Sequence, residues 1–168
     1  MEQWNIIQPE QLERSPFQMI GKDWMLITAE KEGKVNTMTA SWGGVGILWN
    51  KPVTYVFLRP QRFTRELLDG SELFSVCFLP EDYRKQLAYC GAHSGRDGDK
   101  LAACGFSALH LDGAPVLAQS QTALTCRKLF CQQLDPAGFI DTSLDAANYP
   151  QKDYHFLYVS EILGAYLF

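Results

Sequence analysis

Six short segments with strand-like composition follow one another along this chain, and they constrain its fold more than any other feature. Val, Ile, Thr, Leu and aromatic residues dominate them, as is typical of β-strands. They lie at residues 24–30, 35–41, 53–58, 73–79, 122–132 and 155–167. The run at 73–79, LFSVCFL, has no polar face, which indicates a strand buried on both sides.

The predicted helices are few and short. They are expected at residues 64–68, 81–88 and 97–104. Thr64 is placed to cap the first helix, and Ser94 or Asp97 to cap the third. Because these helices do not alternate regularly with the strands, the order argues against parallel βαβ units. We expect a single mainly β domain over residues 1–168, a barrel or sandwich, with residues 1–20 as an irregular lead-in.

Charge and cysteine content exclude several classes of function. The formal net charge is −4, so no overall basic field favours nucleic acid. The five cysteines have irregular spacing and form no C-x-x-C pair, which supports neither a metal site nor a disulfide framework. No apolar run approaches the roughly 18 residues that a membrane span needs. We expect a cytoplasmic protein with free thiols.

The common catalytic motifs are absent from the sequence. It contains no G-x-G-x-x-G, no P-loop, no H-E-x-x-H and no G-x-S-x-G, and its three histidines are scattered. No catalytic side chain can therefore be named. If the protein is an enzyme, we expect a bound cofactor to supply the chemistry.

The first of three polar motifs is NTMTASWGG at residues 36–44. An amide and several hydroxyls gather at the end of a predicted strand, and an indole and two glycines follow them. Such a segment can approach a polar ring or a phosphate closely, while Trp42 covers an apolar face. The alternative is a strand that ends in a tight turn, with Trp42 in the core.

The second and third motifs are basic. RPQRFTRE at residues 59–66 places three arginines at a predicted helix N-terminus, which favours a bound anion. HSGRDGDK at residues 93–100 is a glycine-containing loop in which Ser94, Arg96 and Lys100 could converge on a ligand. The alternatives are an exposed basic turn for the second motif and a solvent loop for the third.

In this order and spacing, the three motifs resemble the flavin reductase-like family of FMN-binding split barrels, which includes flavoredoxins. The matching patterns are N-x-M-T-A-S-W-G-G, R-P-x-R-x-T-x-E and S-G-R-D-x-D-K. Residues 153–162 are also similar to the family's closing strand, so the resemblance runs from about residue 24 to residue 162. It implies a six-stranded Greek-key split β-barrel that forms a homodimer, with FMN at the interface between subunits.

The resemblance also implies roles for individual residues. Asn36 and Trp42 would contact the flavin ring, residues 39–41 would form a backbone and hydroxyl cradle, and Arg62 and Thr64 would bind the phosphate. Lys100, with Ser94 and Arg96 nearby, would be the basic group that reaches the flavin. The expected cofactor-binding residues are Asn36, Met38, Thr39, Ala40, Ser41, Trp42, Arg59, Arg62, Phe63, Thr64, Ser94, Gly95, Arg96 and Lys100.

These roles imply an oxidoreductase that transfers hydride from NADH or NADPH to bound FMN. A flavoredoxin-type electron carrier, which serves a redox partner protein, and a non-catalytic flavin-binding module remain open as alternatives. Few residues follow Glu161, so we expect the ring face to stay open to a nicotinamide. For His155 we expect a structural role on the last strand, paired with Glu161 or with the other subunit.

Overall fold

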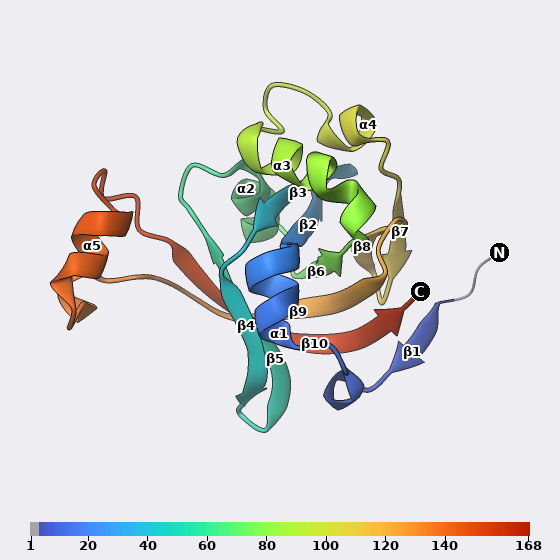
Figure 1. Cartoon of the computed structure of the whole chain (residues 1–168), viewed down its shortest axis with the longest axis horizontal. Helices are drawn as coiled ribbons and strands as arrows, with labels where there is room; N and C mark the ends of the chain where they lie inside the picture. The colour runs from blue at the N-terminus through green and yellow to red at the C-terminus, as the bar shows by residue number, and fades with distance from the viewer. Residues whose placement is uncertain (1–3) are drawn as a thin grey trace.

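The computed structural model describes residues 4–168 and shows a curled antiparallel sheet surrounded by short helices (Figure 1). The main sheet has the strand order β3-β2-β6-β9-β10-β5-β4, and β1 pairs with β10 beside this path. The strands are β1 (Asn5–Ile7), β2 (Met25–Lys31), β3 (Lys34–Ala40), β4 (Gly43–Leu48), β5 (Lys51–Leu58), β6 (Leu73–Phe78), β9 (Thr122–Gln133) and β10 (Phe156–Leu167). A separate hairpin pairs β7 (Ala108–Leu111) with β8 (Ala114–Leu117).

All six strands expected from the sequence are present, as β2, β3, β5, β6, β9 and β10. The mainly β fold with a few short helices is confirmed. The tight turn considered after Trp42 is wrong, because the chain continues there as β4. The turn lies instead between β4 and β5, where Trp49 and Asn50 adopt φ values of 52° and 57°. The sequence analysis did not predict this strand because three of its six residues are glycine, which is depleted in strands.

The sheet curls because its two longest strands bend. β10 pairs with both β9 and β5, and its register with β9 shifts at Val159/Ser160 and at Ile162/Gly164. Such bulges bend a strand and increase its local twist. Ile27 of β2 and Val56 of β5, which are far apart in the strand order, consequently share one buried core. The central strand β6 is buried on both faces, as its sequence predicted.

The helices differ from expectation mainly at their starts. They are α1 (Pro16–Gln18), α2 (Phe63–Asp69), α3 (Arg84–Ala92), α4 (Lys100–Cys104) and α5 (Thr142–Asn148), with short helical turns η1 (Pro9–Gln11), η2 (Met19–Asp23), η3 (Glu81–Tyr83) and η4 (Pro136–Gly138). Thr64 is not the N-cap of α2, because the helix begins one residue earlier and Arg62 occupies that position. Neither Ser94 nor Asp97 caps α4; the carboxylate of Asp99 accepts from the Ala102 N–H instead.

A second buried cluster fixes α3 on the outer side of the sheet. Leu87 and Cys90 of α3 pack with Leu26 of β2, Phe106 and Val116. The hairpin of β7 and β8 covers the neighbouring part of β2 and β6. Because the same strands bury their other side chains in the main core, α3 sits on a rigid base.

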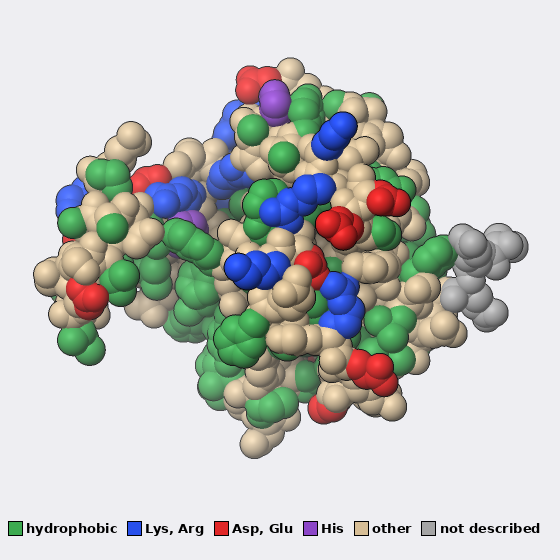
Figure 2. All heavy atoms as spheres, in the orientation of Figure 1, with side chains coloured by type: hydrophobic (Ala, Val, Ile, Leu, Met, Phe, Trp, Pro, Cys, Tyr) green, Lys and Arg blue, Asp and Glu red, His purple; other side chains and the backbone are tan. Residues whose placement is uncertain are grey.

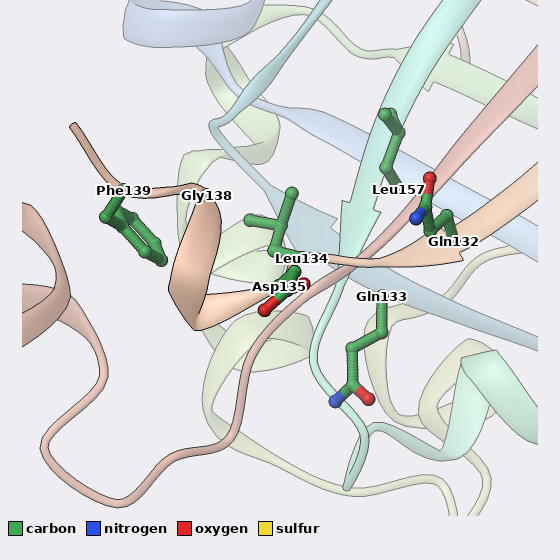
Figure 3. Close-up of a pocket in the computed structure, with 7 residues that line it drawn as sticks. All are labelled: Gln132, Gln133, Leu134, Asp135, Gly138, Phe139 and Leu157. Atoms are coloured by element: carbon green, nitrogen blue, oxygen red, sulfur yellow. The ribbon is translucent and has the colours of Figure 1, made fainter.

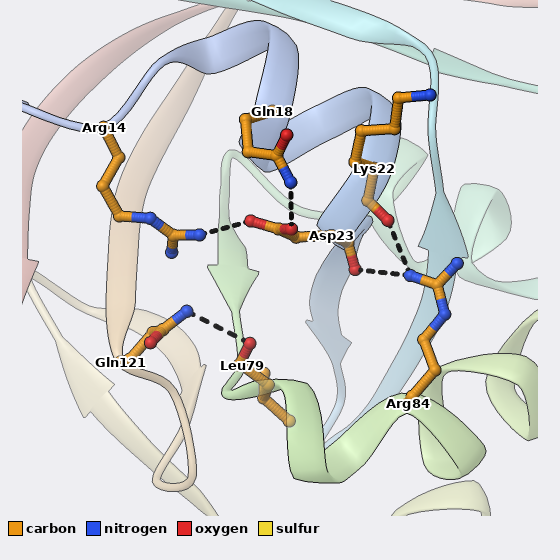
Figure 4. A network of polar contacts seen from close by, with 7 residues as sticks. All are labelled: Arg14, Gln18, Lys22, Asp23, Leu79, Arg84 and Gln121. Carbon is orange, nitrogen blue, oxygen red and sulfur yellow. Dashed lines mark hydrogen bonds and ion pairs between the residues drawn. The ribbon is translucent and has the colours of Figure 1, made fainter.

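Polar contacts tie the N-terminal segment to the start of α3 (Figure 4). Arg14 forms an ion pair with Asp23, whose other carboxylate oxygen accepts from the Gln18 amide at 2.8 Å. Arg84 donates to the backbone carbonyls of Lys22 and Asp23 at 2.7 and 3.2 Å. The first residue of α3 is thereby anchored, which steadies the helix whose other end faces the candidate site.

Residues 134–155 leave the barrel between β9 and β10 and form an arm that stands away from the body in Figure 1. The arm carries η4 and α5, neither of which was expected from the sequence. Phe139, Tyr149 and Tyr154 pack their rings together, with Tyr149 and Tyr154 centroids 4.9 Å apart. Across residues 4–168, no helix has the length and apolar character needed to cross a membrane.

Candidate functional site

Three adjoining cavities lie where β3, α2 and the loop before α4 meet. The first, of about 270 Å³, is lined by residues 38–42 with Phe57, Arg59, Arg62 and His155. The second, of about 170 Å³, shares Arg62 with the first and includes residues 61–64, 92–95, Asn36 and Lys100. The third, of about 550 Å³, shares Asn36, Gly95 and Lys100 with the second. Each of the fourteen residues expected from the sequence lines at least one of these cavities.

The first cavity is the aromatic end of the site. Trp42 lies at its rim with 48% of its surface exposed, and its ring centroid is 5.3 Å from that of His155. Gly43 follows in a conformation that only glycine can take, since a Cβ would lie 2.5 Å from the Tyr55 carbonyl oxygen. The Thr39 hydroxyl is already engaged, because it donates to the Leu87 carbonyl of α3 at 2.5 Å.

Two cations, the buried Lys100 and the half-buried Arg62, line the second cavity, and both reach the C-terminal end of α3. The Lys100 ammonium donates to the carbonyls of Cys90 and His93 at 2.8 and 3.1 Å. The Arg62 guanidinium donates to the carbonyls of Gly91 and Cys90 at 2.9 and 3.3 Å. Cations at this end of a helix satisfy its free carbonyls and oppose its negative dipole. Both side chains keep further N–H groups that these bonds do not use.

Burial lowers the pKa of both cations, and a bound anion would raise these pKa values again. The pKa of Lys100 is lowered to about 8, mainly because burial desolvates the ammonium. The nearby Arg62 guanidinium contributes to this lowering. The pKa of Arg62 is lowered for the same reason, burial. A negative group entering the cavity would favour both charged forms. The site is therefore suited to an anionic group such as a phosphate.

A tight polar contact joins the three motifs beside these cations. The Asn36 amide donates to the Thr64 hydroxyl oxygen at 2.8 Å, and both side chains are buried. The hydroxyl hydrogen of Thr64 is left to donate elsewhere. Gly95 packs closely against the Asn36 side chain. A Cβ at this position would lie 2.3 Å from Asn36 Oδ1 and 2.7 Å from the Phe63 ring.

Arg59 and Arg96 have structural partners of their own. Arg59 forms an ion pair with Asp153 at 2.7 Å and donates to the Asn148 carbonyl at 3.0 Å, so it fastens the arm to β5. Arg96 pairs with Glu66 at the surface and donates to the Gln61 carbonyl at 3.0 Å. The Ser94 hydroxyl accepts from the Arg96 N–H at 3.2 Å, which stabilises the loop itself.

The pairing expected between His155 and Glu161 within the chain is wrong. Glu161 binds Lys51 and Arg127 at 2.7 and 2.6 Å. His155 lies just before β10 and its Nδ1 is 2.7 Å from the Tyr149 hydroxyl. Burial, and secondarily the Arg59 cation, lowers the pKa of His155 to about 4, so the ring is neutral near pH 7.

Phe57, Gln61 and His155 are among the lining residues that the sequence analysis missed. Phe57 could have been found, because it alternates with the buried Val56 and Leu58 on a predicted strand. Tyr149, the partner of His155, lies in the arm, where the sequence offers no pattern that points to the site. A further apolar cavity of about 270 Å³ lies at the base of the arm (Figure 3), lined by Gln132, Gln133, Leu134, Asp135, Gly138, Phe139 and Leu157.

Residues 18–167 match the model of the family described as flavin reductase like domain. The chain belongs to this family. The family covers the barrel, the three motifs and the arm, so the resemblance carried by those motifs is confirmed. No curated protein sequence matches the chain.

Solved structures share the same fold. A flavoredoxin from Methanosarcina acetivorans is 24% identical, with a TM-score of 0.70, over 87% of this chain and 68% of its own. An FMN-binding domain of a flavin reductase-like enzyme from Shewanella baltica is 20% identical, with a TM-score of 0.71, over 98% and 77%. An FMN-binding protein from Thermus thermophilus, solved with p-hydroxybenzaldehyde, is 23% identical, with a TM-score of 0.68, over 95% and 76%. At these identities the likeness establishes the fold.

Proposed function

We propose that this flavin reductase-like protein binds FMN and transfers hydride to it from NADH or NADPH. One observation carries the proposal: the three motifs, distant in sequence, line adjoining cavities that are aromatic at one end and cationic at the other. FMN has the matching form, an aromatic ring joined to a phosphate. When bound, FMN supplies the hydride acceptor on its ring.

The residues around the second cavity fit the phosphate. Arg62 and Lys100 bring two positive charges with unused N–H groups, and Thr64 brings a hydroxyl held in place by Asn36. Gly95 lets the loop approach Asn36 closely, since a Cβ there would overlap the Asn36 amide. Ser94, Arg96 and Phe63 line the same region. We assign this region to the phosphate and its ribityl chain.

The first cavity fits the ring. The backbone of residues 38–41 runs along it, and Trp42 offers an aromatic face at its rim. Lys100 and Arg62 lie on the side nearest the phosphate, where positive charge stabilises negative charge added to the flavin on reduction. His155, neutral at pH 7, completes the wall and presents an uncharged ring to a nicotinamide. No side chain has to act as a base, because hydride transfer to a flavin does not require one.

The nicotinamide step is supported by a distant relative in structure. The NADH:FAD oxidoreductase of Streptomyces globisporus, 16% identical with a TM-score of 0.64, was solved in complex with NAD and FAD fragments. The likeness to flavoredoxins favours a second function, that of an electron carrier for a redox partner protein. A flavin-binding module without turnover is the third outcome that an assay has to separate.

We also propose that the protein is a homodimer with FMN at the interface. Ile47 and Trp49 on the hairpin of β4 and β5 are 63% and 55% exposed. Ile140 and Leu144 on the arm are exposed as well. Figure 2 shows hydrophobic side chains gathered over this hairpin and scattered over the arm. Apolar surface of this kind is typical of an interface between subunits.

Anaerobic reduction tests the proposal. FMN-loaded protein should lose its oxidised-flavin absorbance when NADH or NADPH is added, and free FMN in excess should sustain many turnovers. Bleaching by a small artificial reductant but not by either nicotinamide would instead establish the carrier. Failure to bind micromolar FMN would refute the flavin-based function altogether.

A further inference from the structure

Two cysteine thiols lie side by side next to the candidate site. The sulfur atoms of Cys90 and Cys104 are 3.7 Å apart. Cys90 belongs to the last turn of α3, and Cys104 is the last residue of α4. The two helices pack against each other at the top of Figure 1. A disulfide needs the two sulfurs at about 2.05 Å, so they have to approach by less than the width of an atom.

The two thiols differ in their surroundings. Cys90 is fully buried in the cluster of Leu87, Phe106 and Val116, while Cys104 is partly exposed at the edge of that cluster. Burial, with the neighbouring Cys104 sulfur, raises the pKa of Cys90 to about 12. A small oxidant therefore reaches the Cys104 sulfur first. The buried Cys90 sulfur lies next to it and can react with the oxidised Cys104. This is the arrangement of a reacting cysteine next to a resolving cysteine.

The chain between the two cysteines carries part of the candidate site. Ser94, Gly95 and Arg96 lie in the loop that joins α3 to α4, and Lys100 begins α4. The Lys100 ammonium donates to the carbonyl of Cys90 itself at 2.8 Å. A bond between the two sulfurs would close a loop around these residues and would restrict how far α4 can move from α3.

We propose that Cys90 and Cys104 form a reversible disulfide when the protein reacts with hydrogen peroxide, and that this bond restrains the loop of residues 93–99. The Cys104 sulfur attacks one peroxide oxygen, so that an S–O bond forms, the O–O bond breaks and water leaves. The Cys90 sulfur then attacks the Cys104 sulfur, so that the S–S bond forms, the S–O bond breaks and a second water carries off the Cys90 proton. One hydrogen peroxide is reduced and two thiols are oxidised.

The remaining cysteines provide the controls. Cys131 is exposed on β9 and could form bonds between molecules, so the test uses the full-length chain with Cys131→Ser. Cys77 and Cys126 are buried and should stay reduced. The matched variant adds Cys104→Ser, which removes the partly exposed sulfur and leaves the buried Cys90 in its place in the core.

Hydrogen peroxide treatment followed by peptide mass analysis gives the answer. We expect loss of two thiols, one peptide pair joined through Cys90 and Cys104, full reversal by dithiothreitol, and slower amide hydrogen exchange at residues 93–99. With Cys104→Ser no joined pair should form. Oxidation of Cys104 to sulfinic acid while Cys90 remains a free thiol would overturn the proposal, and so would a joined pair that leaves exchange in the loop unchanged.

Discussion

The affinity of this protein for FMN should fall as the pH rises above about 8, because Lys100 loses its proton there. Burial lowers the pKa of this ammonium to about 8 from its ordinary 10.5. An anionic flavin beside Lys100 stabilises the charged form, so the pKa in the complex is higher than in the free protein. Between these two pKa values binding takes up a proton, and the affinity decreases by up to about tenfold for each pH unit.

The size of the effect follows from the shift. If FMN restores the ordinary value of 10.5, the two pKa values differ by about 2.5 units, which corresponds to roughly 3 kcal/mol as an upper bound. Quenching of FMN fluorescence, titrated from about pH 7 to about pH 9.5, measures the affinity. Lys100→Arg should remove most of the pH dependence, since a guanidinium stays charged throughout this range.

Lys100→Met separates the two roles of this lysine. It should bind FMN weakly at every pH, and its affinity should no longer fall above pH 8. The reasoning is refuted if the unsubstituted protein has the same affinity across the range and Lys100→Met matches it. Lys100 would then serve only the carbonyls of Cys90 and His93 at the end of α3.

Substitutions at three further positions test the site and the assembly. Thr64→Val should weaken FMN about ten- to a hundredfold while hardly changing riboflavin, and Thr64→Ser should restore FMN; equal losses for both flavins in calorimetry would indicate structural damage. Gly95→Ala places a Cβ 2.3 Å from Asn36 Oδ1, so melting temperature and FMN affinity should drop together; unchanged melting would show that the loop can yield. Light scattering should give a dimer that Trp49→Glu dissociates, and a monomer with FMN bound would contradict the proposed interface.

The sequence predicted those structural features that depend on residues close together in the chain. The strand-like composition of residues 24–30 and 35–41 predicts two successive strands. The structure pairs them as a hairpin, with Glu32 and Gly33 in its left-handed turn at φ values of 52° and 76°. Gly105 ends α4 in the left-handed conformation with φ 66°, which glycine adopts without strain. These features depend on residues only a few positions apart, so a single sequence contains enough information to find them.

Contacts between distant segments were out of reach of such patterns. His155 lies just before β10 and pairs with Tyr149 of the arm, while Glu161 pairs with Lys51 and Arg127. Strand alternation places residues on one face, but at roughly 3.3 Å per residue it does not bring residues six positions apart into contact. Arg59 has its partner at Asp153, which lies in the arm. Only the fold brings these residues together, so the sequence could name residues that line the cavities but not their partners.

The end of α3 shows why structural and binding roles coincide in this site. The C-terminal end of a helix carries partial negative charge and would repel a phosphate placed beside it. Arg62 and Lys100 lie between that end and the second cavity, and they donate to its carbonyls on one side. Their remaining N–H groups can meet an anion on the other side. The two cations thus convert a helix end unsuited to a phosphate into one wall of an anion site, and removing either should weaken both helix and site.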